Sequence, residues 1–84
     1  MDELRIELRG EEFRFPKSRS CTFGRDADLV LARDARIASV AGTIWYANGL
    51  WWIRNDSQTH FVGVADRDSD SVIHVAPGSE NVLA

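Results

Sequence analysis

Apolar and polar residues alternate along most of the chain. Residues 4–8 place leucine or isoleucine at every second position, and residues 12–15 do the same with phenylalanine after a reversal at Gly10. A period of two is typical of a strand with one face against a core and the other in water. The pattern predicts an N-terminal hairpin that ends at Pro16, because proline has no N–H for the ladder.

The strongest local signal is Asn48-Gly49, which lies between two runs of strand-forming residues, 43–47 and 50–54. Asn-Gly in this setting favours a type I′ turn, in which both central residues have positive φ. A two-residue turn fixes the register, and directly opposed residues share a face. One face is then formed by Ile44, Tyr46, Trp51 and Ile53, and the other by Trp45, Ala47, Leu50 and Trp52.

Shorter apolar runs complete the pattern at residues 21–23, 29–31, 61–64, 72–75 and 82–83. Residues 32–36 are the only segment that a helix could claim. They are too few to sustain one, so we expect a loop with at most one helical turn. Many short strands separated by turn residues predict an all-β sandwich or barrel.

Composition narrows the class of protein. Eighty-four residues make one domain, and 44% hydrophobic residues exclude a disordered tail. Ten basic against thirteen acidic residues give a net charge of −3, which disfavours nucleic acid as a partner. No apolar run approaches the 18 residues of a membrane span, and the single Cys21 excludes an internal disulfide. We therefore expect a soluble, cytoplasmic domain that does not bind membranes.

Several short segments together form a recognisable order. They are Thr22–Leu31 with its Gly24-Arg25 step, Asp34–Ile37, Gly42–Ile44, Trp51–Asn55 and Ser57–His60. Over roughly residues 20–64 this order and spacing resemble a forkhead-associated (FHA) domain. That family is a β-sandwich that reads phosphothreonine peptides through loops at one end. The resemblance implies a small antiparallel β-sandwich acting as a non-catalytic protein-interaction module, without a cofactor.

The resemblance also implies a ligand site centred on Arg25. A planar guanidinium binds phosphate oxygens bidentately, and Gly24 beside it would let a ligand approach the backbone. Ser39, Thr59 and His60 would complete the site with hydroxyl and imidazole hydrogen bonds. The family pattern is eroded here, because Ala38 stands at the phosphate-binding serine and Ala41 at the structural histidine.

Three further positions of that pattern also differ, whereas Arg25 and Thr59 match it. Ser39 stands at the motif arginine, His60 at the asparagine that binds the peptide backbone, and Phe61 at a glycine. A form that binds a protein partner without phosphate is therefore the alternative function. Each site residue also has a plainer interpretation: Arg25 can pair with a nearby aspartate, and loop serines and threonines often bond their own backbone.

The family normally continues into a last strand that completes its second sheet. In this sequence, either that strand is short, or it is missing, or another chain supplies it. We interpret residues 1–84 as one FHA-like domain of a longer protein, with an unpaired sheet edge that favours self-association. Trp45 and Trp52, together on the outer face, form a candidate partner surface; alternatively, they shield one another or are covered by the N-terminal hairpin.

Other chemistry finds little support in the sequence. The chain has no Gly-x-Ser-x-Gly elbow for a hydrolase, so we expect no enzymatic activity. The acidic run Asp66–Asp70 lacks the glycine and glutamate of a calcium loop. His74 has no second ligand at metal spacing, and Cys21 is expected in the core, so no metal site is predicted.

Overall fold

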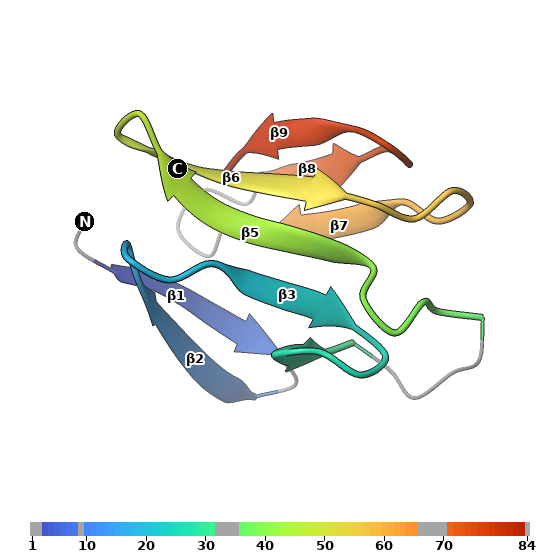
Figure 1. The fold of residues 1–84 in the computed structure, drawn as a ribbon, viewed down its shortest axis with the longest axis horizontal. Helices are drawn as coiled ribbons and strands as arrows, with labels where there is room; N and C mark the ends of the chain where they lie inside the picture. Colours follow the sequence, from blue (N-terminus) through green and yellow to red (C-terminus); the bar gives the residue numbers. More distant parts are fainter. Residues whose placement is uncertain (1–2, 9, 32–35, 66–70, 84) are drawn as a thin grey trace.

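The computed structural model of this chain describes residues 3–8, 10–31, 36–65 and 71–83. None of these residues is helical, and nine strands account for most of them (Figure 1). The predicted all-β class is therefore confirmed. The strands are β1 (Glu3–Leu8), β2 (Glu11–Pro16), β3 (Cys21–Gly24), β4 (Leu29–Val30), β5 (Gly42–Ala47), β6 (Leu50–Asn55), β7 (Val62–Ala65), β8 (Val72–Val75) and β9 (Glu80–Val82).

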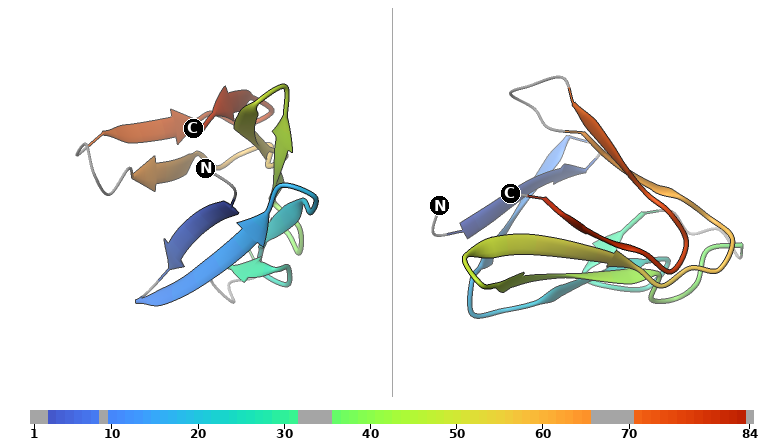
Figure 2. Two further views of the ribbon diagram at one scale, coloured as in Figure 1. Left: turned by 90° about the vertical axis from the view of Figure 1, so that its left-hand side faces the viewer. Right: turned by 90° about the horizontal axis from the view of Figure 1, so that it is seen from above.

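Five of the strands form one sheet, in the order β4-β3-β5-β6-β9. Neighbours in it are antiparallel except for the short parallel pair of β3 and β4. The remaining strands form two separate antiparallel hairpins, β1-β2 and β7-β8. Figure 2 (left) shows both hairpins on the same side of the five-stranded sheet.

The central hairpin of the sheet follows the sequence prediction residue by residue. Ala47 pairs with Leu50, and Trp45 pairs with Trp52. The turn residues have φ of 54° at Asn48 and 79° at Gly49, as a type I′ turn requires. The turn chemistry therefore fixes both the register and the face on which each side chain lies.

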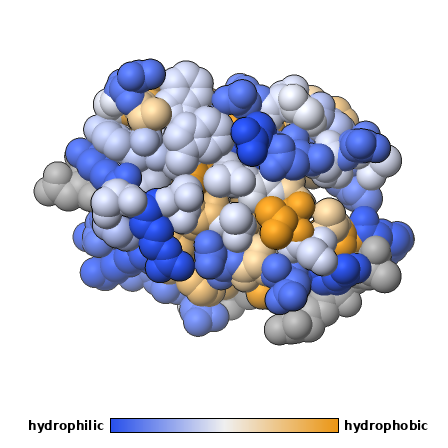
Figure 3. Space-filling model, viewed as in Figure 1, coloured by the Kyte–Doolittle hydropathy of each residue, from blue (hydrophilic) through white to orange (hydrophobic). Residues whose placement is uncertain are grey.

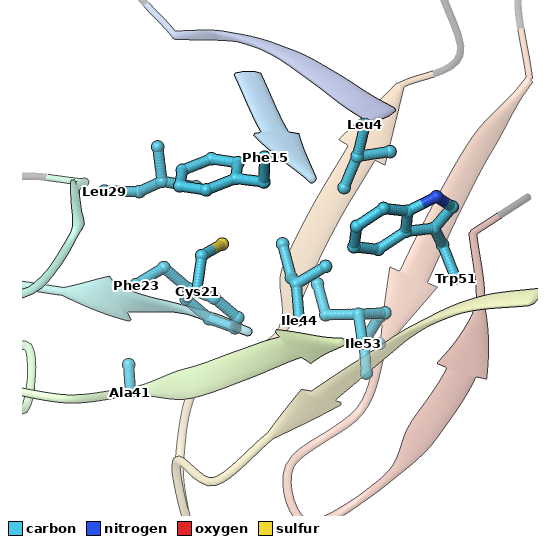
Figure 4. Packing of buried hydrophobic residues seen from close by; sticks show 10 residues of the cluster. Leu4, Phe15, Cys21, Phe23, Leu29, Ala41, Ile44, Trp51 and Ile53 are labelled. Atoms are coloured by element: carbon cyan, nitrogen blue, oxygen red, sulfur yellow. The ribbon is translucent and has the colours of Figure 1, made fainter. Parts of the chain in front are cut away.

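The core lies between the five-stranded sheet and the two hairpins (Figure 4). Leu4 and Phe15 enter it from β1 and β2, and Val75 enters it from β8. The sheet contributes Cys21, Phe23, Leu29, Ile44, Trp51 and Ile53, and Ala41 enters the core just before β5. Burial of these side chains holds both hairpins against one face of the sheet, because a side chain such as leucine, isoleucine or phenylalanine contributes roughly 1.5–3 kcal/mol when fully removed from water.

Two interpretations of the sequence concern segments that lie largely outside the described residues. They are the loop predicted over residues 32–36, of which only Arg36 is described, and the acidic run Asp66–Asp70. Cys21 is 1% exposed, which confirms its predicted place in the core. In the described ranges no helix is long and apolar enough to cross a membrane.

Candidate functional site at the loop end of the sheet

Three loops meet at one end of the five-stranded sheet, at the right of Figure 1. The antiparallel pairing of β3 with β5 and of β5 with β6 brings together the end of β3, the start of β5 and the end of β6. The loops that leave these strand ends carry Arg25, Ser39, Thr59 and His60, all four of the predicted ligand-binding residues.

Arg25 and Ser39 lie in direct contact. The Arg25 guanidinium Nη2 donates a hydrogen bond to the Ser39 hydroxyl at 3.0 Å. The backbones of the two loops are also paired, since Arg25 N–H donates to the Ala38 carbonyl and Asp26 N–H donates to the Ser39 carbonyl, both at 3.0 Å. These contacts hold the guanidinium at the surface of the loop end.

Gly24 makes this close approach of the loops possible. A Cβ atom on Gly24 would lie 2.5 Å from the Ser39 carbonyl oxygen and 2.8 Å from that of Ala38. The prediction that Gly24 admits a ligand to the backbone is therefore wrong, because the chain's own residues 38–41 occupy that space. A glycine is needed at position 24 because any side chain there would prevent the loop after β3 from packing against the loop before β5.

Asp28, one of the aspartates near Arg25 in the sequence, contacts two other residues. The carboxylate of Asp28 accepts a hydrogen bond from the backbone N–H of Thr22 at 3.0 Å and forms an ion pair with Arg19 at 3.4 Å. Asp28 therefore stabilises the start of β3 through Thr22, and its charge is paired with that of Arg19.

Asn55 organises the third loop from inside the protein. Its side chain is fully buried, and its Nδ2 donates to the carbonyls of His60 at 2.7 Å and Val75 at 2.9 Å. Its Oδ1 accepts from the Ser57 N–H at 3.0 Å. One side chain thus ties the loop after β6 to β8, which fixes the position of His60.

The sequence analysis named Asn55 only as the end of the Trp51–Asn55 segment and missed this role. A signal was available, because Asn55 continues the inward-facing alternation of Trp51 and Ile53 along β6. A polar residue at an inward position of a strand must find partners inside the protein, since an unpaired buried amide is costly.

Thr59 and His60 form a second polar pair at the loop end. The Thr59 hydroxyl and the His60 Nδ1 lie 2.8 Å apart and share a hydrogen bond. Behind them, the Ser57 hydroxyl accepts from the backbone N–H groups of Thr59 at 3.2 Å and of His60 at 3.0 Å. Turn chemistry of the expected kind therefore occurs, but at Ser57, and it leaves the side chains of Thr59 and His60 at the surface.

An apolar pocket of about 140 Å³ lies between the second and third loops. It is smaller than the roughly 300–1,000 Å³ of a small-molecule site, so its size suits one aliphatic side chain. Ala38, the neighbour of Ser39, and His60 both line it, so the pocket adjoins the two loops that carry the polar pairs. The full lining is Leu31, Ile37, Ala38, Ala41, Ser57, His60, Phe61 and Val62.

Trp45 and Trp52 lie elsewhere, on the face of the sheet opposite the core. Their rings stack with 6.5 Å between centroids, and both side chains are half-buried. The Trp52 indole donates to the Ala47 carbonyl at 3.0 Å, and the Arg54 guanidinium lies 5.8 Å from the centroid of the Trp45 ring. The predicted mutual shielding therefore occurs in part.

The same face also carries more exposed apolar residues. Figure 3 shows pale residues of intermediate hydropathy over the left part of β5 and β6. Leu50, which pairs with Ala47, is 38% exposed, and Val82, which pairs with Trp52, is 39% exposed. The tryptophan pair and these two residues form a mixed apolar surface separate from the loop end.

Among the described residues, no three histidine, cysteine or acidic side chains cluster as metal ligands would.

Comparison of the chain with family models, curated proteins and solved structures yields no match in any of the three. The FHA resemblance therefore rests on the residues and their order alone.

Proposed function

We propose that the chain is an FHA-like β-sandwich that binds phosphothreonine-containing protein segments at its loop end. The observation that carries the proposal is that the Arg25–Ser39 pair and the Thr59–His60 pair lie on loops at one end of the sheet, beside an apolar pocket that Ala38 and His60 line. In this interpretation, the two hairpins are an incomplete second layer of the sandwich. The module is non-catalytic and acts by binding.

Arg25 supplies the main recognition of the phosphate. Arg25 is half-buried and its guanidinium is oriented by Ser39, so less side-chain entropy remains to be lost when a phosphate is bound. Thr59 and His60 present hydroxyl and imidazole groups at the same loop end, where they can bond the peptide backbone. The pocket lined by Ala38 and His60 takes an apolar side chain of the same peptide.

The expected affinity is low. A charge-assisted hydrogen bond contributes about 1.5–3 kcal/mol, whereas a neutral one of the kind that Ala38 cannot make contributes about 0.5–1.5 kcal/mol. We expect dissociation constants of roughly tens to hundreds of micromolar. Binding should weaken as salt rises, because exposed charges are screened within a Debye length of about 10 Å at 0.1 M.

Selection from a phosphothreonine peptide library tests the proposal. The wild-type domain should enrich phosphorylated over unphosphorylated peptides, with an apolar residue at a fixed offset from the phosphothreonine. Arg25→Ala should abolish the enrichment. Arg14→Ala is the matched control, since it removes the same charge from an exposed position on β2. Equal recovery of both peptide classes by the wild type would refute the proposal.

A second candidate function is protein binding without phosphate recognition. The bound protein is then a different partner or a second copy of this chain. The surface of Trp45, Trp52, Leu50 and Val82 favours it, because paired aromatics beside exposed apolar residues are typical of interfaces. Under this alternative, Trp45→Ala would abolish capture of the partner, and Arg25→Ala would leave it unchanged.

A further inference from the structure

The layer opposite the five-stranded sheet is built in two unconnected pieces. Among the described strands, β1 pairs only with β2, and β7 pairs only with β8. Figure 2 (left) shows β1 and β7 as the strands that face each other across this layer. Strand edges that pair with nothing are templates for additional strands, and isolated two-stranded hairpins are only marginally stable.

The pairing of β1 with β2 shows which backbone groups point to the other edge of β1. Leu8 and Glu11 are joined by a two-residue loop, so they form a hydrogen-bonded pair. Bonded and non-bonded pairs then alternate along the hairpin, and Glu3 lies opposite Pro16 in a non-bonded pair. This assignment agrees with proline's lack of an N–H. It follows that the N–H and carbonyl groups of Arg5 point away from β2, toward the side of β7.

A second observation lies in the core beneath this edge. The Trp51 side chain is 2% exposed, and its Nε1 has no hydrogen-bond partner among the described residues. Figure 4 shows Leu4 beside the indole ring and the indole nitrogen on the edge of the ring away from Ile53. A buried indole N–H almost always has a partner in native proteins, so a missing one calls for an explanation.

We propose that the edge of β1 accepts an extended segment from a partner polypeptide, which adds a strand to this layer. A backbone carbonyl of the added strand would also accept the hydrogen bond of the Trp51 indole. One occupant thus accounts for both the unpaired edge and the orphan donor. An apolar ligand without a backbone could supply neither interaction.

The side chains of β1 define the chemistry of that segment. The inward face carries Leu4, which is buried, and Ile6, which is half-buried, so the added strand must have apolar residues at alternate positions. The outward face carries Glu3 and Arg5. Opposite charges across a strand pair are stabilising, so a basic residue should face Glu3 and an acidic one should face Arg5.

A synthetic peptide of sequence TKVEVKT meets these requirements. When the peptide pairs antiparallel to β1, its glutamate faces Arg5 in a hydrogen-bonded pair and its valines face the apolar side. We expect it to raise the thermal midpoint of the domain and to shift the Trp51 indole N–H signal downfield in a ¹⁵N–¹H spectrum. Trp51→Phe identifies that signal. The same peptide methylated at the backbone nitrogen of its glutamate is the control and should produce no shift.

Arg5→Pro tests the edge itself. It removes an N–H that β2 does not use, so the variant should fold with an unchanged thermal midpoint and bind the peptide at least tenfold more weakly. Equal binding of the plain and methylated peptides, or no binding up to millimolar peptide, would overturn the proposal. A Trp51 shift that depends on protein concentration without peptide, and that Arg5→Pro removes, would instead assign the edge to a second copy of the chain.

Discussion

The guanidinium of Arg25 and the hydroxyl of Ser39 are joined by a hydrogen bond of 3.0 Å between residues fourteen positions apart in the sequence. The bond links the loop after β3 to the loop before β5. It also means that a substitution at Ser39 acts on Arg25 as well as on any ligand. For that reason Ala38 is the better position at which to restore the family's serine.

The first prediction concerns Ala38 and Ser39. Ala38→Ser should tighten binding of a phosphothreonine peptide about three- to tenfold, because one neutral hydrogen bond to the phosphate contributes about 0.5–1.5 kcal/mol. Ser39→Ala should weaken peptide binding by a similar factor, because the Arg25 guanidinium loses the hydrogen bond that orients it. Both residues are exposed, so the unfolding midpoint should not move. Fluorescence anisotropy with a labelled phosphopeptide measures both changes, and a tighter Ser39→Ala variant would contradict the orienting role of Ser39.

Asn55 gives a prediction about stability. Asn55→Leu should lower the free energy of unfolding by about 2–4 kcal/mol, because it leaves the buried carbonyl of Val75 and other loop groups without their partner. Asp56→Ala is the matched control. It breaks only the exposed ion pair with Arg54, which is expected to contribute under about 1 kcal/mol. Urea denaturation compares the two, and similar losses would show that Asn55 is not a structural anchor.

The Gly49 turn gives a second prediction about stability. Gly49→Val should destabilise the domain by roughly 1 kcal/mol or more, because a β-branched residue is strained at a φ of 79°. Gly63→Ala is a suitable comparison, since an added Cβ there would approach only His74, at 3.9 Å. Thermal unfolding monitored by tryptophan fluorescence should distinguish them. An unchanged midpoint for Gly49→Val would argue against the type I′ turn.

Cys21 gives a prediction about pH. Burial raises the pKa of its thiol from 9.0 to about 11, with a smaller contribution in the same direction from the charge of Asp28. The folded state thus holds the thiol proton more tightly than the unfolded state does. The stabilisation is complete below pH 9 and is lost as pH rises from 9 to 11, with a maximum of about 2–3 kcal/mol. Unfolding by urea at pH 8 and pH 10.5 measures it.

Cys21→Ala is the control for that experiment. Other groups titrate in the same range, so the variant should retain their share of the pH dependence and lose the share of the thiol. If the wild type and Cys21→Ala lose stability equally between pH 8 and pH 10.5, the raised pKa of Cys21 has no effect on folding.

Local chemistry explains why much of the fold could be predicted. Asn48-Gly49 determines its turn and register without help from the rest of the chain, and the alternation of residues 4–8 determines which face of β1 is buried. Local sequence patterns could not predict that β1 and β7 belong to separate hairpins, because that depends on pairing between strands that are distant in the sequence. The sequence predicted an incomplete second sheet only through its resemblance to a family.

The candidate site shows the same division. The Gly24-Arg25 step identified one residue of the site, but the partner of Arg25 and the true reason for Gly24 depend on the approach of residues 38–41, which are remote in sequence. Asn55 was missed because its partners, His60 and Val75, belong to a loop and to another strand. Polar residues at inward strand positions are therefore worth separate examination in sequences of this kind.

Isothermal titration calorimetry with one peptide in phosphorylated and unphosphorylated form tests the central claim most directly. The peptide is the one that library selection enriches, titrated at low salt into the wild type and Arg25→Ala. We predict that the wild type binds the phosphorylated form at least tenfold more tightly, and that the preference falls with added salt and disappears in Arg25→Ala. Equal affinity of the wild type for the two forms would contradict phosphothreonine recognition at the loop end.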